Sequence, residues 1–376
     1  MRIKVMLVFG TRPEAIKMCP LVKEMQKRDD EFEVVTCVTG QHREMLASVL
    51  DAFEVDPEYN LDIMSASQTL FDITNQVLTG MQEVIKQEKP DLILVHGDTT
   101  TSFASALSSF YMHVPIGHVE AGLRTHNLNS PWPEEFNRQA VDLVSDLYFA
   151  PTEQARKNLL DEGKDPNRIF VTGNTGIDAL ASTISEDYKS DVLDWADGSK
   201  LVLITAHRRE NLGEPMRNMF HAIKRVLEEN PEVKAVYPIH MNPAIRKLAK
   251  EVFGDAERLR IVEPLDVLDF HNLMASCAII LTDSGGVQEE APSLGVPVLV
   301  MRDTTERPEG VEAGTLRLVG TDEETIYMEF TKLLKNASAY EKMARAVNPY
   351  GDGKASARIS AIIASYFSKE GLKLAN

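Results

Sequence analysis

Short apolar runs rich in β-branched residues alternate with helix-like stretches along this chain, and the alternation limits the folds that are open to it. Strands that alternate with helices normally build a parallel sheet with helices on both faces. The runs form two series, at 3–9, 33–38, 92–95, 116–119, 147–150 and 169–172 and then at 201–205, 235–238, 259–261, 278–282, 298–301 and 316–319. The sequence therefore predicts an α/β protein with two doubly wound, Rossmann-like halves.

The boundary between the halves is expected where the alternation is interrupted. The stretch 185–200 is polar and less periodic than its surroundings. A chain of 376 residues is long enough for two sizeable cores. We place the first domain over 1–171 and the second over 172–357, and we expect the final helix, 358–376, to pack back on the first domain.

Composition excludes several classes of protein. The net charge of -17 argues against a nucleic-acid-binding protein, which needs a basic face. No apolar run is long enough to cross a membrane, and the first residues lead directly into a strand with no signal peptide expected. The three cysteines lack metal-site spacing and cannot form a complete set of disulfides, which favours a reducing compartment. The sequence predicts a cytoplasmic protein.

One strand leads into a turn that is suited to phosphate. After the run 278–282, Ser284 is a typical helix-capping residue, and Gly285 and Gly286 allow a tight turn into a helix. Unpaired N–H groups at the start of a helix bind phosphate well. Either Glu289 or Glu290 could accept hydrogen bonds from ribose hydroxyls, as acids do in dinucleotide sites, or both could simply complement the helix dipole.

The first strand also ends in a loop of interest. Residues 10–17 read GTRPEAIK, in which Pro13 suits the first turn of a helix. The loop matches neither the dinucleotide fingerprint nor the P-loop, so a nicotinamide cofactor is not expected. Arg12 and Lys17 nevertheless follow the carboxyl end of a strand, where open α/β sheets bind ligands.

Three acidic residues gather at the same kind of position. Asp98 and Glu120 follow predicted strands, and Glu134 begins a helix after a proline-flanked turn. Carboxylates grouped around one site are suited to general acid–base catalysis if burial shifts their pKa values. A single acid at such a position is more often a helix cap or a surface acid, but three of them together at the carboxyl ends of strands weaken that interpretation.

The second half offers further polar and aromatic candidates. His207 follows a strand and could bind phosphate or donate a proton, although a lone histidine is more often structural. Phe270 could stack on a base or pack in a core. Arg307 is expected to face the glycine turn and to bind a diphosphate through two of its guanidinium nitrogens. No spacing typical of zinc or calcium sites occurs, and no metal is expected.

Several of these motifs together resemble one enzyme family. They are GTRPEAIK at 10–17, HGDTTT at 96–101, GHVEAGLRT at 117–125, PEE at 133–135, HRREN at 207–211, TDSGGVQEEAPSLG at 282–295 and RDTTERPE at 302–309. The chain is similar to the bacterial non-hydrolysing UDP-N-acetylglucosamine 2-epimerases from about residue 3 to residue 353. The resemblance implies the GT-B architecture, in which two Rossmann-like domains enclose an interdomain cleft.

The implied activity is the reversible conversion of UDP-N-acetylglucosamine to UDP-N-acetylmannosamine, which supplies N-acetylmannosamine for cell-surface polysaccharide. Direct removal of the proton on carbon 2 is unfavourable without an adjacent carbonyl group, and transient oxidation would need the missing nicotinamide site. Anti elimination of UDP to a 2-acetamidoglucal, followed by re-addition of UDP, needs no cofactor. The alternatives are a hydrolysing epimerase, a GT-B glycosyltransferase and a non-enzymatic nucleotide-sugar sensor.

The resemblance also implies roles for individual residues. The catalytic set is Asp98, Glu120, Glu134 and His207, with the order of proton removal and return left open. At position 265 some relatives have a polar side chain, so any uracil contact of Leu265 would be made by its backbone. The family resemblance assigns the ribose contact to Glu290. Substrate-binding residues are Arg12, Lys17, Asp98, Glu120, His207, Leu265, Phe270, Ser284, Gly285, Gly286, Glu290 and Arg307.

Some family members bind a second UDP-N-acetylglucosamine as an allosteric activator, and the family also suggests a homodimer. Ser67 and Glu44 stand where some relatives have arginine and glutamine, which suggests weaker activator binding. The matching positions for the activator in this chain are Gln41, His42, Arg43, Gln68, Arg208 and His240.

Overall fold

The computed structural model describes residues 2–40, 43–65, 68–305 and 307–374. The chain forms two compact units, one made of Met1–Ser182 with Tyr350–Asn376 and the other of Thr183–Pro349. Among the described helices, none is both long enough and apolar enough to cross a membrane.

The first unit is built on a seven-stranded sheet in the order β3-β2-β1-β4-β5-β6-β7. Every pairing between its strands is parallel. The strands are β1 (Ile3–Phe9), β2 (Phe32–Val38), β3 (Tyr59–Asn60), β4 (Leu92–His96), β5 (Ile116–Val119), β6 (Leu147–Ala150) and β7 (Ile169–Val171).

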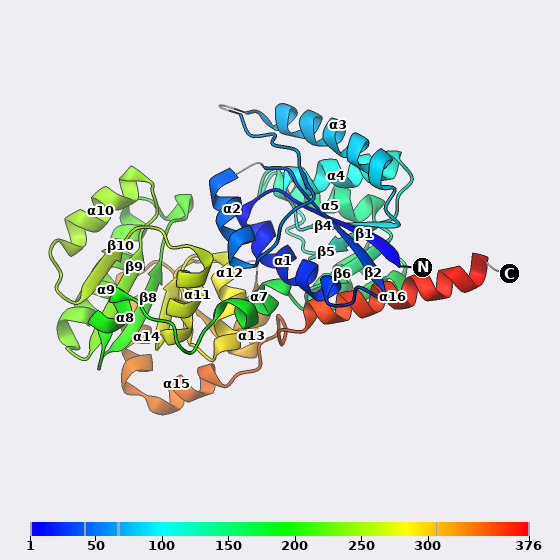
Figure 1. The fold of residues 1–376 in the computed structure, drawn as a ribbon. Coiled ribbons are helices and arrows are strands. Elements are labelled where there is room, and N and C mark those ends of the chain that lie inside the picture. The colour runs from blue at the N-terminus through cyan, green and yellow to red at the C-terminus, as the bar shows by residue number, and fades with distance from the viewer. Residues whose placement is uncertain (1, 41–42, 66–67, 306, 375–376) are drawn as a thin grey trace. The chain divides into compact units, whose positions relative to one another are not determined.

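Helices cover both faces of this sheet (Figure 1). They are α1 (Arg12–Gln26), α2 (Arg43–Ala52), α3 (Leu70–Glu88), α4 (Thr100–Tyr111), α5 (Glu134–Val144), α6 (Glu153–Asp161), the short η1 (Pro166–Arg168), α7 (Thr175–Thr183) and α16 (Ala355–Leu374). The strand β4 is buried along its whole length, as expected for a central strand whose two faces both meet helices.

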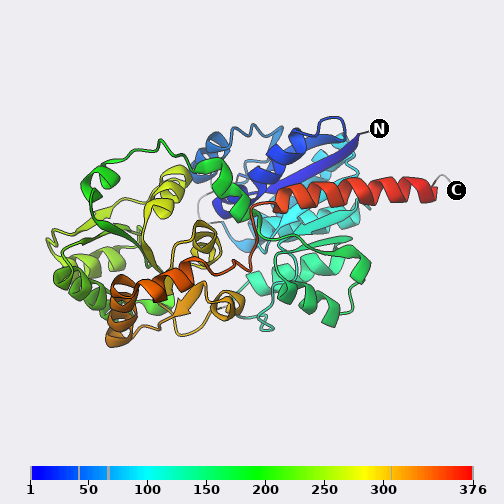
Figure 2. The ribbon, with the colours of Figure 1, turned by 90° about the horizontal axis from the view of Figure 1, so that it is seen from below.

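The C-terminal helix belongs to the first unit, where it packs against α1 (Figure 2). The side chain of Asp178 in α7 accepts hydrogen bonds from the first backbone N–H groups of α16, at Ala355 (3.1 Å) and Ser356 (2.7 Å). These donors have no partner within a helix, so Asp178 supplies the missing cap. The structure thus places α7 with the first unit, whereas the sequence analysis drew the boundary before it.

The second unit has a six-stranded parallel sheet in the order β10-β9-β8-β11-β12-β13. Its strands are β8 (Lys200–Thr205), β9 (Val233–Pro238), β10 (Leu259–Val262), β11 (Ile279–Thr282), β12 (Val298–Val300) and β13 (Leu316–Leu318). Its helices are α8 (Asp191–Ala196), η2 (Arg209–Asn211), α9 (Glu214–Glu229), α10 (Pro243–Phe253), α11 (Val267–Ser276), α12 (Gly285–Glu290), η3 (Ala291–Leu294), α13 (Pro308–Ala313), α14 (Glu323–Lys335) and α15 (Ala337–Ala344).

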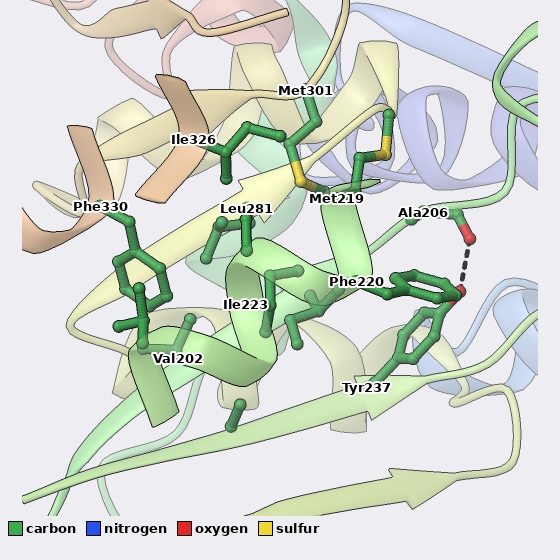
Figure 3. Close-up of a cluster of buried hydrophobic side chains, with 14 of the residues drawn as sticks. Val202, Ala206, Met219, Phe220, Ile223, Tyr237, Leu281, Met301, Ile326 and Phe330 are labelled. Carbon is green, nitrogen blue, oxygen red and sulfur yellow. Dashed lines mark hydrogen bonds between the residues drawn. The ribbon is translucent and has the colours of Figure 1, made fainter. Parts of the chain in front are cut away.

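The core of the second unit lies between its sheet and the helices α9, α10 and α14 (Figure 3). Phe220 of α9 packs edge-on against Tyr237 of β9, with ring centroids 5.7 Å apart. The buried hydroxyl of Tyr237 donates to the carbonyl oxygen of Ala206 at 2.6 Å, as Figure 3 shows. A buried hydroxyl needs such a partner, and this one fixes the loop after β8.

The α/β class and the two doubly wound parallel sheets of the GT-B architecture are confirmed. The predicted strands all occur, with ends that differ by one or two residues at most. Two short elements were not predicted. They are β3, which has only two residues, and α8, which lies in the stretch that was interpreted as a polar bridge.

Candidate functional site

In each sheet the strand order reverses at one point, and such switch points are where open α/β sheets bind ligands. In the first sheet the reversal lies between β1 and β4, and in the second it lies between β8 and β11. The predicted residues Arg12, Asp98 and Glu120 follow β1, β4 and β5. His207 and Ser284 follow β8 and β11. Each sheet therefore carries its own cluster of candidate residues.

Glu14 organises the cluster in the first sheet. Its side chain is buried and accepts hydrogen bonds from the backbone N–H groups of Gly10 (3.0 Å) and Thr11 (2.8 Å). It also accepts from the hydroxyls of Thr99 (2.6 Å) and Ser102 (2.9 Å) in the loop and helix after β4. Burial nevertheless raises the pKa of Glu14. One carboxyl group thus links the two loops that flank the switch point.

Gly10 is required by this close approach of the two loops. A Cβ atom at this position would lie 2.7 Å from the hydroxyl oxygen of Thr101 and would also collide with the hydroxyl of Thr39. These two hydroxyls are themselves within hydrogen-bonding distance, at 3.2 Å. Only glycine fits between β1 and α1.

Glu120 has an unusual backbone and several polar neighbours. It follows β5 with φ +67, in the left-handed region that few non-glycine residues adopt. Its carboxylate forms an ion pair with Lys17 of α1 and accepts a hydrogen bond from the side-chain amide of Asn174 at 3.3 Å. The ring nitrogen Nε2 of His96 lies 3.7 Å from the same oxygen. The structure therefore brings the predicted Lys17 and Glu120 together.

Asp98 is held by the start of α5. Its side chain forms an ion pair with Arg138, and its backbone carbonyl oxygen accepts from the side chain of Asn137 at 3.0 Å. Arg138 also contacts Glu135, which is fully buried. Glu134, the third predicted acid, is the first residue of the same helix and is partly buried. Asp98 and Glu134 thus depend on one helix for their placement.

A buried ionic network helps to hold the loop that carries Asp98. His118 of β5 bonds the carboxylate of Asp142 at 2.6 Å and the carbonyl oxygen of Gly97 at 2.8 Å. Asp142 also pairs with Arg124 at 2.7 Å, and Arg124 pairs in turn with Glu162. Burial alone would raise the pKa of Asp142, but His118 and Arg124 hold it below its usual range. The carbonyl of the residue before Asp98 is thereby fixed.

In the second unit a buried aspartate organises the loop after β8. Asp283 accepts hydrogen bonds from the backbone N–H groups of His207 (2.9 Å) and Arg208 (2.9 Å) and from the side chain of Asn211 (3.2 Å). Burial lowers the pKa of His207, opposed by Asp283 and assisted by His240 and Arg208. Asp283 therefore positions the predicted His207.

The glycine turn after β11 lies under an arginine. The guanidinium nitrogen Nη1 of Arg307 is 2.7 Å from the place where a Cβ atom on Gly285 would stand. The Nε of Arg307 donates to Glu289 at 2.6 Å, which fixes the plane of the guanidinium group. Ser284 occupies the N-cap position of α12 but its side chain makes no capping hydrogen bond, and its backbone N–H donates to the hydroxyl of Thr282 at 2.9 Å. Positive charge therefore lies beside the start of α12, where an anion would also meet helix N–H groups.

Glu290, the predicted ribose ligand, lies near a buried histidine. His271 of α11 has its Nε2 atom 3.7 Å from the Glu290 carboxylate, and its Nδ1 atom bonds the hydroxyl of Thr183 at 2.7 Å. Phe270 and Leu265 are partly buried in and before the same helix. The ring of Phe270 is centred 6.4 Å from that of His271. Glu290 and Phe270 are thus placed by neighbouring elements.

The predicted activator residues are described only in part. Gln41, His42 and Ser67 lie outside the described residues, and only the backbone of Arg43, at the start of α2, is described. The side-chain amide of Gln68 donates to the carbonyl oxygen of Ile63. His240 stacks on His207 with ring centroids 5.7 Å apart and planes 10° from parallel. The second unit therefore places one predicted activator residue against a predicted substrate residue.

Four side chains near these clusters were not assigned from sequence. They are His96, Asn174, His271 and Asp283. Each follows or ends a strand, or lies beside Phe270, so position along the chain could have flagged them. Within the described ranges, no group of three or more His, Cys, Asp or Glu residues is placed to hold a metal ion. The three cysteines are unpaired and buried, and burial raises the pKa of Cys19 and of Cys37 to about 12, which makes poor nucleophiles of both.

Comparison with known proteins gives one consistent result. The family model described as UDP-N-acetylglucosamine 2-epimerase matches residues 23–364. The UDP-N-acetylglucosamine 2-epimerase of Bacillus subtilis is 59% identical over 358 residues, which is 95% of this chain and 94% of that protein. Two solved structures are similar throughout. An S. aureus protein solved with UDP has a TM-score of 0.90 at 49% identity, covering 98% of this chain and 97% of its own. The UDP-GlcNAc 2-epimerase of Neisseria meningitidis, bound to UDP-GlcNAc, has a TM-score of 0.87 at 47% identity, covering 96% and 99%.

Proposed function

Because the chain belongs to the UDP-N-acetylglucosamine 2-epimerase family, we propose that it interconverts UDP-N-acetylglucosamine and UDP-N-acetylmannosamine reversibly and without net hydrolysis. The product would supply N-acetylmannosamine for cell-surface polysaccharide. We place this activity in the cytoplasm, which the unpaired state of all three cysteines favours.

The proposed reaction uses the nucleotide as a leaving group. Breaking the bond between carbon 1 and the UDP oxygen while a base removes the proton on carbon 2 leaves a double bond between the two carbons. The product of this step is a 2-acetamidoglucal. UDP then adds back to carbon 1, and an acid delivers a proton to the opposite face of carbon 2. Apart from the carbon 2 hydrogen, which exchanges with solvent, every atom of the nucleotide sugar is retained, and the proposed reaction needs no cofactor.

The carboxylates at the switch point of the first sheet carry this proposal. Asp98, Glu120 and Glu134 would remove and return the carbon 2 proton, in an order that coupled acids do not reveal individually. Glu120 is paired with Lys17 and Asn174, an arrangement that orients a carboxylate for proton transfer. The single strongest observation is this fixed Glu120 at the end of β5.

The second unit would hold the departing diphosphate. Ser284, Gly285 and Gly286 offer the start of α12, and Arg307 lies directly over Gly285. His207 would add a hydrogen bond, with Arg12 contributing charge from the first unit. Fixed donors and cations of this kind stabilise charge that develops on a leaving group.

The nucleoside would be recognised by residues that follow these elements. We propose that Glu290 accepts hydrogen bonds from the ribose hydroxyls, since its side chain is largely buried and its carboxylate lies 3.7 Å from Nε2 of His271. Phe270 would stack near uracil, and Leu265 would contact the base through its backbone. These roles need no side-chain donor at position 265.

Proton NMR in deuterated water tests the proposal. With UDP-N-acetylglucosamine as substrate, we expect deuterium to appear at carbon 2 while both UDP-sugars persist at equilibrium. Release of free N-acetylmannosamine would instead indicate a hydrolysing epimerase. Sugar transfer to an added acceptor would indicate a glycosyltransferase. The absence of any reaction would favour a non-enzymatic nucleotide-sugar sensor.

The catalytic role of Asp98, Glu120 and Glu134 can be tested by replacing each carboxylate with the matching amide. Asp98→Asn, Glu120→Gln and Glu134→Gln should each lower turnover at least about a hundredfold, the usual contribution of a catalytic acid or base. Calorimetry should find UDP affinity largely unchanged, because these three acids are not among the proposed diphosphate ligands. Near-normal turnover in all three variants would remove their catalytic assignment.

We also propose that UDP-N-acetylglucosamine activates the enzyme at a second site on Gln41, His42, Arg43, Gln68, Arg208 and His240. The stacking of His240 on His207 supports this idea, because a ligand at His240 would act on a substrate residue. Initial rates with UDP-N-acetylmannosamine should then rise when a trace of UDP-N-acetylglucosamine is added. A hyperbolic dependence of the initial rate on UDP-N-acetylmannosamine concentration, unchanged by added UDP-N-acetylglucosamine, would contradict activation.

A homodimer is the assembly that we propose. Helix α4 contains no charged residue, and it packs against α5. Phe110, Tyr111 and Leu143 on these two helices are exposed by 53%, 66% and 74%. Large apolar side chains that gather on adjacent helices are typical of protein–protein interfaces.

A further inference from the structure

His96 occupies a central and fully enclosed place in the first sheet. It is the last residue of β4, which lies between β1 and β5. Its register partner on β5 is Val119, so Glu120 follows at the same level of the neighbouring strand. The His96 side chain is only 6% exposed, and the residue's carbonyl oxygen accepts from the hydroxyl of Ser102 at 2.5 Å. The ring therefore has little freedom to turn away from Glu120.

The ring nitrogen that faces Glu120 has no hydrogen-bond partner among the described residues. Nε2 of His96 lies 3.7 Å from the Glu120 oxygen, which is too long for a hydrogen bond. Buried polar atoms are nearly always satisfied, and the exceptions tend to mark functional sites. This nitrogen points at a group whose protonation changes in the proposed reaction.

The surroundings keep His96 neutral. Burial lowers the pKa of His96 to about 3, opposed by Glu120 and assisted by Lys17 of α1 and His118 of β5. These are the charged and titratable groups that act on the ring, and His118 is itself bonded through both nitrogens. A neutral imidazole has one N–H group and one lone pair. It can therefore accept a hydrogen bond, which Lys17 cannot do.

The other neighbours of Glu120 favour its ionised form. Lys17 and Asn174 both donate to the carboxylate. Donors of this kind stabilise a carboxylate relative to the acid. A group that relays the carbon 2 proton must also exist as the acid, and an acceptor is needed for that state.

We propose that His96 is a positioning residue that stabilises Glu120 in its carboxylic acid form by accepting a hydrogen bond at Nε2. The inference rests on the proposed function, in which a proton moves between carbon 2 and a carboxylate. That proton comes to lie on a Glu120 oxygen and is shared with His96 without being transferred to it. The same oxygen gives the proton up again. The role of His96 is the same whether Glu120 removes or returns the proton.

Replacement of the acceptor should change the pH profile. In His96→Phe, the acid form of Glu120 loses its partner, so the pKa of Glu120 falls. The limb of the kcat profile that Glu120 governs should move to lower pH by about one unit, and kcat at the optimum should fall about tenfold. KM for UDP-N-acetylglucosamine should stay within about twofold, since His96 is proposed to act only through Glu120.

Two further variants separate this effect from loss of packing. His96→Gln keeps an acceptor oxygen and should restore most of the profile. His221→Phe makes the same change at an exposed position of α9 and should leave both the profile and kcat unchanged. In a Glu120→Gln background, His96→Phe should add no further loss to the residual rate, because the titrating partner is absent.

Failure of the proposed epimerase activity and failure of the proposed role of His96 would give different results. Failure of the wild-type enzyme to exchange the carbon 2 hydrogen with deuterated water would overturn the proposed function. Normal exchange, with a folded His96→Phe variant whose pH profile matches wild type, would overturn only the role of His96. So would a loss in His96→Gln as large as that in His96→Phe.

Discussion

At the scale of single residues, Glu120 combines a left-handed backbone with an ion pair and a hydrogen bond at its carboxylate. A non-glycine residue in the left-handed region carries a local cost of about 1 kcal/mol, which surrounding contacts must offset. Lys17 and Asn174 contact the Glu120 carboxylate, and Asp142 holds the flanking residues His118 and Gly122. In this conformation the carboxylate forms an ion pair with Lys17.

The buried His96 should make stability depend on pH. Its pKa is about 3 in the folded protein, below the ordinary value of about 6.5 in an unfolded chain. The unfolded chain therefore binds an extra proton below about pH 6.5, and the free energy of unfolding falls as pH drops from there toward 3. The free energy of unfolding can be measured by denaturant titration at several pH values between 6.5 and 4. Plotted against pH, it should rise less steeply in His96→Gln than in wild type, by up to about 1.4 kcal/mol per pH unit.

The control for this measurement is His221→Gln, which changes an exposed histidine. It should reproduce the wild-type slope. Identical slopes for His96→Gln and wild type would mean that His96 titrates normally in the fold.

Gly285→Ala tests the placement of Arg307. The new methyl group would meet the guanidinium at 2.7 Å and force it away from the start of α12. We expect the Kd for UDP, measured by calorimetry, to rise about tenfold, equivalent to about 1.4 kcal/mol.

Arg307→Gln should weaken UDP binding by a similar factor, and the double variant should be little weaker than either single one. Contacting residues are non-additive in this way. Strict additivity would mean that the methyl group acts directly on the ligand and not through Arg307.

Sequence reasoning identified residues whose local pattern carries the signal. The Ser284–Gly286 turn and the strand ends at Asp98 and Glu120 follow from spacing and from turn chemistry. Asn174 and His96 also lie at or after strand ends, but no role could be assigned to them from sequence. The role of each depends on its contact with Glu120, which is distant from both along the chain. A proposed role for such a residue needs the distance to Glu120, which no local pattern contains.

At the scale of elements, α16 depends on a cap that another helix supplies. Asp178→Ala would leave the N–H groups of Ala355 and Ser356 without their acceptor. We expect the free energy of unfolding to fall by about 1–3 kcal/mol, the usual cost of unsatisfied buried groups. Limited proteolysis should then release a C-terminal fragment sooner than in wild type.

Asp29→Ala serves as the matched variant, since Asp29 is an exposed aspartate of the same unit. It should leave both the unfolding curve and the proteolysis rate unchanged. Equal protection of the C-terminus in Asp178→Ala and wild type would show that packing on α1 is sufficient by itself.

The main elements of the fold were predictable because each long strand is an uninterrupted apolar run between turn signals. The strand β1 was located to the residue, since Ile3–Phe9 ends at Gly10. The strand β3 has only two residues and gives no such pattern. The helix α8 was missed because its Ser190 cap and its acidic first turn read as a polar linker.

At the scale of the whole molecule, assembly should depend on α4 and α5. Light scattering should give a mass of twice 41.9 kDa for the wild-type chain. Phe110→Arg and Leu143→Arg place charges on the proposed interface and should give the monomer mass, because an unpaired charge is costly to bury.

Met328→Arg introduces the same charge at an exposed methionine of α14, in the second unit. It should leave the mass unchanged. A dimer that survives both Phe110→Arg and Leu143→Arg would place the interface on another surface.

The first unit is interrupted in the chain, since Tyr350–Asn376 completes what Met1–Ser182 begins. During synthesis on the ribosome, the whole of Thr183–Pro349 emerges before α16 does. The second unit has its own buried core and can fold before α16 is synthesised. Until then, the face of α1 that packs against α16 stays exposed. Nascent chains of this protein should therefore expose α1 to chaperones until α16 has emerged from the ribosome and covers it.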